Sequence, residues 1–174
     1  MIIKGIRDED FLQYKLASMF VAFPSCTFKC ERECEQAKGM CQNGALVKAP
    51  DIECTPKDIV DRYISNPISK AMVCGGLEPF DSFEDLYRLL AEFRSKSSDP
   101  FIIYTGYNKD EVQYMTFFRN CAGGTVEYSV LESLKKLPNV IIKYGRFIPN
   151  QKPHYDEVLG VELASPNQYA EKIS

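Results

Sequence analysis

The cysteines are the residues whose type and spacing most directly suggest chemistry. The chain has seven, and five of them fall within one short segment: Cys26, Cys30, Cys34, Cys41 and Cys54. Such crowding indicates metal ligation or redox chemistry rather than a disulfide framework. His154 is the single histidine, so Cys/His nucleophile pairs and two-histidine metal sites lack imidazoles. We therefore expect thiolates to carry the chemistry, and we give His154 a surface or structural role.

The intervals between the first four cysteines bear on the kind of metal. They contain three, three and six residues. A structural zinc site usually takes its cysteines as two close pairs, and an electron-transfer cluster usually has shorter intervals. Neither pattern fits well, although three or four of these thiols are close enough in sequence to reach one metal centre. We treat Cys34, Cys54, Cys74 and Cys121 as small buried or incidental residues by default.

The composition is that of one ordinary globular domain. The chain has 174 residues, of which 45% are hydrophobic and 26% charged, and its formal net charge is −3. This length predicts a single domain, residues 1–174, with a sizeable apolar core. The mildly acidic balance argues against nucleic acid as a partner, and no apolar run suits a signal peptide or a membrane span. We expect a cytoplasmic protein.

Apolar runs alternate with amphipathic segments along the rest of the chain. Strands are expected at residues 17–23, 71–74, 101–105 and 140–144, most of them ending near glycine or proline. Helices are expected from Thr55 to about Ser65, after Ser82, from Asn108 through Phe118, and over residues 128–136. Gly123 and Gly124 break the chain between the last two helices. The apolar stripe of residues 83–93, with Phe117 and Phe118, is assigned to the core.

This alternation predicts an α/β domain, either a partial (β/α) barrel or an open, mainly parallel sheet, with at least four parallel strands. In such folds the ligand site lies beyond the carboxyl ends of the strands. The segments that follow the strands are 24–30, 75–79, 104–107 and 145–147. We expect these segments to converge on one crevice. The long cysteine-rich segment 24–54 should belong to that crevice, because so long a loop in a compact domain is usually functional.

The first cysteines resemble the metal-binding motif of the radical S-adenosylmethionine family. Its members hold a 4Fe–4S cluster with three cysteines, usually spaced Cys-x-x-x-Cys-x-x-Cys, on the loop after the first strand. Cys26 and Cys30 match the first two positions. For the third, Met40 before Cys41 suits the apolar position that packs near adenine in the family, whereas Cys34 follows an acidic residue. We expect Cys26, Cys30 and Cys41 to be the metal ligands, with Cys34 as the alternative third ligand.

Two further segments resemble this family. Gly75-Gly76-Leu77-Glu78-Pro79 is similar to its Gly-Gly-Glu-Pro motif with Leu77 inserted, and Tyr104-Thr105-Gly106 is similar to a segment that lines the nucleoside pocket. The resemblance implies two cofactors, a 4Fe–4S cluster and S-adenosylmethionine. It also implies which residues bind them besides the cysteines: Met40, Gly75, Gly76, Leu77, Glu78, Tyr104, Thr105 and Gly106.

Within the family, the chain looks most like the small glycyl-radical activating enzymes, through Cys41-Gln42-Asn43, Gly145-Arg146-Phe147 and Ser165-Pro166-Asn167-Gln168. This likeness implies an oxidoreductase that cleaves S-adenosylmethionine to a 5′-deoxyadenosyl radical and leaves a glycyl radical on a partner such as anaerobic ribonucleotide reductase. A flavodoxin- or ferredoxin-like protein would donate the electron. Two alternatives stay open: a small-molecule radical enzyme similar to the 7-carboxy-7-deazaguanine synthases, and a non-catalytic module that binds metal with four cysteines.

Overall fold

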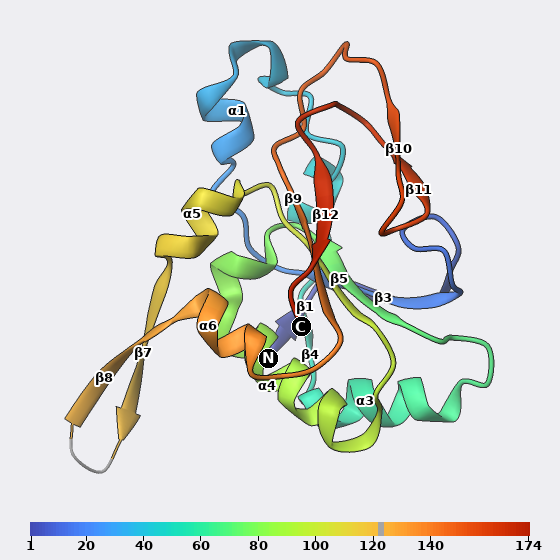
Figure 1. The fold of residues 1–174 in the computed structure, drawn as a ribbon, viewed down its shortest axis with the longest axis vertical. Helices are drawn as coiled ribbons and strands as arrows, with labels where there is room; N and C mark the ends of the chain where they lie inside the picture. The colour runs from blue at the N-terminus through green and yellow to red at the C-terminus, as the bar shows by residue number, and fades with distance from the viewer. Residues whose placement is uncertain (122–123) are drawn as a thin grey trace.

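A computed structural model describes residues 1–121 and 124–174 of the chain. The expectations for the Cys121 side chain and for a break at Gly123 fall outside what it describes. One six-stranded sheet forms the centre of the molecule (Figure 1). Its strand order is β12-β9-β6-β5-β3-β2. Its strands are β2 (Gly5–Asp10), β3 (Ser18–Phe23), β5 (Met72–Gly76), β6 (Phe101–Tyr104), β9 (Val140–Tyr144) and β12 (Tyr169–Lys172).

The four inner strands of this sheet are the ones that the apolar runs predict. Strands β3, β5, β6 and β9 are parallel and adjacent in chain order, which confirms the expected parallel core. The edge strands β2 and β12 are antiparallel to their neighbours and were not predicted. The sheet is open and mixed, mostly parallel, so the structure has the open form of the two predicted architectures.

Helices cover one face of the sheet. The connections contain α3 (Pro56–Ser65), α4 (Phe83–Lys96), α5 (Lys109–Tyr114) and α6 (Val130–Lys135). Apolar residues of these helices form one core cluster with alternate residues of the inner strands, such as Val21, Cys74 and Ile103. The intervening strand residues, such as Val73, Ile102 and Ile141, face the other way and pack with Tyr14, Leu159 and Leu163. The second face therefore carries a thinner cover made of loops and short strands.

The helix predicted over residues 108–118 is wrong in its second half. Helix α5 ends at Tyr114, and the chain continues as β7 (Thr116–Cys121), which pairs with β8 (Gly124–Ser129) in an antiparallel hairpin. This hairpin extends away from the sheet (Figure 1). Phe117 packs against Phe83 of the core, whereas Phe118 points outward with 63% of its surface exposed. Successive strand residues face opposite sides, so the two phenylalanines cannot share one core face.

Several short elements complete the chain. Segment 24–54 contains α1 (Lys29–Glu33), the 3-10 turn η1 (Glu35–Ala37) and α2 (Gly44–Val47), and β4 (Ile52–Glu53) pairs with β1 (Ile2–Ile3). The 3-10 turn η2 (Pro79–Ser82) precedes α4, and β10 (His154–Asp156) pairs with β11 (Val161–Leu163). Within the described ranges, none of the helices combines the length and apolar character needed to cross a membrane.

Candidate functional site

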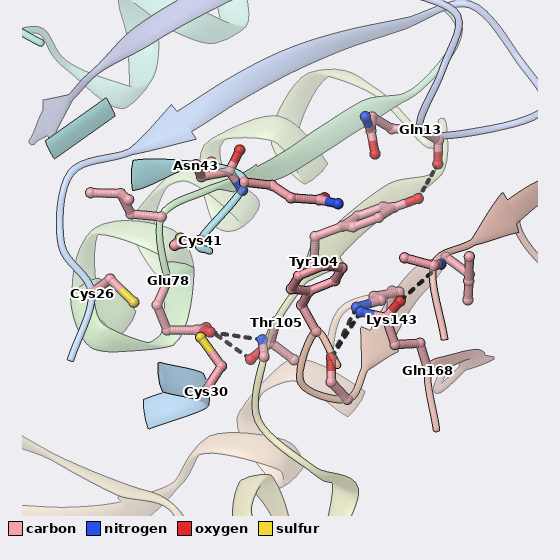
Figure 2. A pocket seen from close by; sticks show the side chains of 18 of the residues that line it. Gln13, Cys26, Cys30, Cys41, Asn43, Glu78, Tyr104, Thr105, Lys143 and Gln168 are labelled. Carbon is pink, nitrogen blue, oxygen red and sulfur yellow. Dashed lines mark hydrogen bonds between the residues drawn. The ribbon is translucent and has the colours of Figure 1, made fainter. Parts of the chain in front are cut away.

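The carboxyl ends of the parallel strands open onto one cavity of about 380 Å³ (Figure 2). All four post-strand segments contribute to its wall, which confirms the predicted convergence. The lining includes Cys26, Cys30, Cys41, Gly76, Leu77, Glu78, Tyr104, Thr105, Gly106, Lys143, Gly145 and Phe147. The cavity volume is in the range of a small-molecule or cofactor site.

The three predicted metal ligands share this cavity, whereas Cys34 and Met40 do not line it. Cys26, Cys30 and Cys41 are half-buried free thiols in its wall. Cys34, the alternative third ligand, is also free but lies outside the described lining. Met40 likewise does not line the cavity, and 49% of its surface is exposed. The structure thus brings Cys41, and not Cys34, to the same wall as the first two cysteines.

Local hydrogen bonds hold the cysteine segment in this position. Phe28 adopts a left-handed conformation with φ of 53°, and its N–H donates to the Cys26 Sγ at 3.2 Å. Cys30 lies in α1, and Glu31 of the same helix accepts a hydrogen bond from the Cys41 amide at 3.2 Å. The same short helix therefore links the second cysteine to the third.

The electrostatics of the thiols show what a metal would have to overcome. Burial, together with the nearby carboxylates Glu78 and Asp81, raises the pKa of Cys26 to about 12. Burial also raises the pKa of Cys30, and the neighbouring Cys41 adds to the effect. Both thiols are accordingly protonated at neutral pH, and a metal would bind by displacing their protons.

The donor set fits an iron–sulfur cluster by its chemistry, but it is not gathered into a binding geometry. Cysteine thiolates are the ligands that iron–sulfur clusters take from proteins, and three cysteines lie in this one cavity wall. Among the described residues, however, no group of three or more His, Cys, Asp or Glu side chains is close enough to hold a metal ion. Binding would require the cysteine-bearing segment to draw its thiols together.

Glu78 lies in the cavity wall two residues after β5 ends, within the predicted Gly-Gly-Leu-Glu-Pro segment. Its carboxylate accepts hydrogen bonds from the Thr105 Oγ1 at 2.8 Å and from the amides of Gly106 and Phe80 at 2.8 and 3.1 Å. Burial nevertheless raises the pKa of Glu78 to about 7. This carboxylate is fixed in orientation and ready to accept a further hydrogen bond or to face a cation.

The two glycines of this segment have different roles. Gly76 has a φ of 82°, and a Cβ there would lie 2.9 Å from the backbone of Ala22, so only glycine fits this turn into the cavity. Gly75 does not line the cavity. A Cβ at that position would meet the Phe20 ring at 3.1 Å, so Gly75 allows close packing beneath the site instead.

Lys143 is the functional candidate that sequence reasoning missed. Its side chain reaches the cavity wall although only 6% of the residue is exposed, and its Nζ donates to the Gly145 carbonyl at 3.0 Å and lies 5.9 Å from the Tyr104 ring centroid. Burial lowers the pKa of Lys143 to about 8, and the charge of Glu78 opposes this shift. The signal available in the sequence was one lysine inside an otherwise apolar strand, Val140–Tyr144.

The polar groups divide the cavity into two ends. In Figure 2 the three thiols and Glu78 lie on one side, Lys143 and Gln168 lie on the other, and Thr105 lies between them. Gln168 is buried and donates to the same Gly145 carbonyl as Lys143, at 3.3 Å. A ligand that fills the cavity therefore meets soft thiols and a carboxylate at one end and an ammonium group at the other.

Comparisons of the chain with protein-family models, with curated proteins and with solved structures gave no match.

Proposed function

We propose that the protein is a radical S-adenosylmethionine enzyme, and that it activates a glycyl-radical enzyme of the anaerobic ribonucleotide reductase type. The observation that supports this most is the meeting of Cys26, Cys30 and Cys41 with Glu78 at the carboxyl ends of parallel strands. When bound there, a 4Fe–4S cluster supplies the electron that cleaves S-adenosylmethionine to a 5′-deoxyadenosyl radical. The three cysteines would hold the cluster and leave one iron without a protein sulfur.

The other cavity residues suit the parts of S-adenosylmethionine. Glu78 offers a fixed carboxylate to the methionine ammonium group, beside the turn at Gly76 where backbone approaches the ligand. The Lys143 ammonium, at the other end of the cavity, offers a hydrogen-bond donor to the nucleoside, whose hydroxyls and ring nitrogens accept hydrogen bonds. Tyr104 and Thr105, at the end of β6, line the wall where the nucleoside would lie.

The structure favours a protein substrate over a small-molecule substrate, and it favours an enzyme over a module that binds metal with four cysteines. The domain has few elements on the cavity side of its sheet, and Phe11 and Leu12 beside the cavity are 65% and 69% exposed. Cys34 does not line the cavity, which weighs against a module with four cysteine ligands. A cytoplasmic location is part of the proposal, because Cys26, Cys30 and Cys41 are free thiols that must stay reduced. A flavodoxin- or ferredoxin-like protein would donate the electron.

The test is an anaerobic assay of the reconstituted protein. Iron and sulfide are added, the cluster is reduced with dithionite, and 5′-deoxyadenosine formed from S-adenosylmethionine is measured by chromatography. We expect the wild type to form this nucleoside, Cys41→Ala to lose both iron and product, and Cys34→Ala to keep both. An intact cluster without product would instead identify a binding module, and loss of iron in Cys34→Ala would favour a four-cysteine site.

A further inference from the structure

Helix α1, which carries Cys30, has no apolar anchor. None of its five residues is buried. Its N-cap residue is Phe28, whose side chain has no atom that could cap the helix by a hydrogen bond. Helices of this length are unstable without tertiary contacts. Whatever holds Cys30 in the cavity wall must therefore be polar.

Four charged residues supply that polar attachment. Lys29 and Glu33 stand one turn apart on α1, on either side of Cys30. The Lys29 Nζ donates to the Glu111 Oε1 at 2.5 Å, and the Glu33 Oε2 lies 2.7 Å from the Arg146 Nε. Glu111 belongs to α5, and Arg146 follows the sheet strand β9 by two residues. These contacts therefore join α1 to the core domain body, which consists of the six-stranded sheet and its helices.

The two body residues are themselves firmly held. Arg146 is 8% exposed, and its Nη1 and Nη2 donate to the two Glu111 carboxylate oxygens at 2.6 and 2.7 Å. Glu111 also accepts a hydrogen bond from the Asn108 amide at 2.8 Å, as part of the capping box that begins α5. Arg146 keeps the pKa of Glu111 far below its usual value, at about 2, so the carboxylate stays charged. A bidentate pair of this kind fixes direction as well as distance.

We infer that Arg146 and Glu111 are positioning residues that hold Cys30, and through Glu31 Cys41, in the cavity wall, where the segment has only to draw its thiols together to bind a cluster. The inference rests on the proposed function, since it concerns the cysteines that would hold the cluster. The salt bridges act on α1 only. Cys26 is held separately, because the neighbouring Thr27 amide donates to the Asp81 carboxylate at 2.6 Å and Asp81 also accepts from the Tyr107 hydroxyl.

This difference gives a test on the metal-free protein. The rate at which a thiol reagent labels each cysteine is measured by mass spectrometry in the wild type and in Arg146→Met. We expect Cys30 and Cys41 to react roughly two- to fivefold faster in the variant, the factor expected for loss of one partly exposed ion pair, and Cys26 to react at its wild-type rate. General destabilisation would instead raise all three rates together.

Arg62→Met is the matched control. Arg62 makes a bidentate pair with Asp8, at 2.6 and 2.7 Å, on the surface and without contact to α1. The variant Arg62→Met should therefore leave the labelling rates of Cys26, Cys30 and Cys41 unchanged. If Arg146→Met does not fold, the double variant Lys29→Met/Glu33→Gln weakens both ion pairs that join α1 to Glu111 and Arg146, and it should give the same selective increase.

Equal labelling rates in Arg146→Met and the wild type would overturn the inference, as would an equal increase at all three cysteines. Because the labelling needs neither metal nor S-adenosylmethionine, a failure of the radical chemistry would not alter its outcome. A second measurement follows the iron content and the spectrum of the reconstituted protein. Arg146→Met should bind less iron than Arg62→Met under the same conditions.

Discussion

At the scale of single residues, Glu78 gives the clearest pH dependence. Its pKa is raised to about 7 by burial, from an ordinary value of 4.5. Between these values the folded state holds a proton that the unfolded state has lost, so the free energy of unfolding falls as the pH rises from about 4.5 to 7. The conversion of pKa to free energy gives a fall of roughly 3 kcal/mol over this pH range. Glu78→Gln, which cannot ionise, should not show this fall.

The measurement is urea unfolding of the metal-free protein at pH 5 and pH 7.5. The difference between wild type and Glu78→Gln should change with pH, and the exposed Glu157→Gln should show no such change. A difference that is the same at both pH values would mean that Glu78 is already ionised throughout this range.

The position of Lys143 leads to a prediction about the affinity for S-adenosylmethionine. The buried ammonium has one hydrogen bond, to the Gly145 carbonyl, and it faces the cavity. Lys143→Met removes the charge at nearly constant length, so binding of S-adenosylmethionine to the reconstituted protein should weaken by about 1.5–3 kcal/mol, or roughly 10- to 100-fold. Equilibrium dialysis measures this.

Stability should respond in the opposite direction. Without ligand, Lys143→Met removes a desolvated charge and should be neutral or stabilising. The exposed Lys70→Met serves as the control and should change neither quantity. Unchanged affinity in Lys143→Met would show that Lys143 makes no contact with the cofactor.

At the scale of elements, the start of α3 shows how local sequence becomes stability. The Thr55 side chain accepts from the Asp58 amide at 3.2 Å, and the Asp58 carboxylate accepts from the Thr55 amide at 2.9 Å. Thr55→Ala should lower the free energy of unfolding by about 1 kcal/mol. Ser82 occupies the same position before α4 but makes no capping hydrogen bond with its side chain, so Ser82→Ala should cost less.

Denaturant unfolding of both variants decides this prediction, and equal losses would contradict it. Neither substitution touches the cavity wall, so iron content after reconstitution should match that of the wild type. The pair of variants therefore also separates the effect of stability from the effect of the site.

The elements that the sequence predicted correctly are those whose signal is local. The inner strands are continuous apolar runs because both of their faces are buried, and α3 begins with a capping box and a proline that need no distant partner. Strand β2 was missed because Gly5–Asp10 is mostly charged and pairs on one side only, with β3. Its pairing depends on a neighbour that local periodicity cannot reveal.

The candidate site was predictable to a similar degree. Glycines at strand ends and crowded cysteines are visible in the sequence, and the rule that parallel strands share one carboxyl edge brings them together. Lys143 and Gln168 were missed because their role depends on which face of the sheet they occupy. The ion pairs of Arg146 were hidden for the same reason, since Glu33, Glu111 and Arg146 lie far apart in the chain.

At the scale of the whole molecule, segment 24–54 stands apart from the rest of the fold. Among its residues Ala37 alone is buried, whereas the sheet and its helices form two continuous core clusters. The hydrophobic effect therefore contributes little to holding this segment on the domain. Stretches with few buried apolar groups open at low free-energy cost, so this segment should fluctuate more than the sheet in the metal-free protein.

Metal binding should change this balance. Cys26, Cys30 and Cys41 come from three points of the segment, and ligands that bind only the folded state stabilise it by mass action. At a free ligand concentration about 100 times the Kd, the gain is about 2.7 kcal/mol, which raises the Tm by roughly 5–10 °C for a domain of this size. Thermal melting under anaerobic conditions, before and after reconstitution, measures the shift.

The location of the effect matters as much as its size. Reconstitution should slow proteolysis within segment 24–54 more than elsewhere, and a chelator should reverse both the protection and the Tm shift. Cys41→Ala should show neither change, whereas Cys34→Ala should show both, because only Cys41 shares the cavity wall with the other two thiols. A reconstituted protein that melts and is cleaved like the metal-free form would show that the segment does not close around a metal, and the cavity would then need a different ligand.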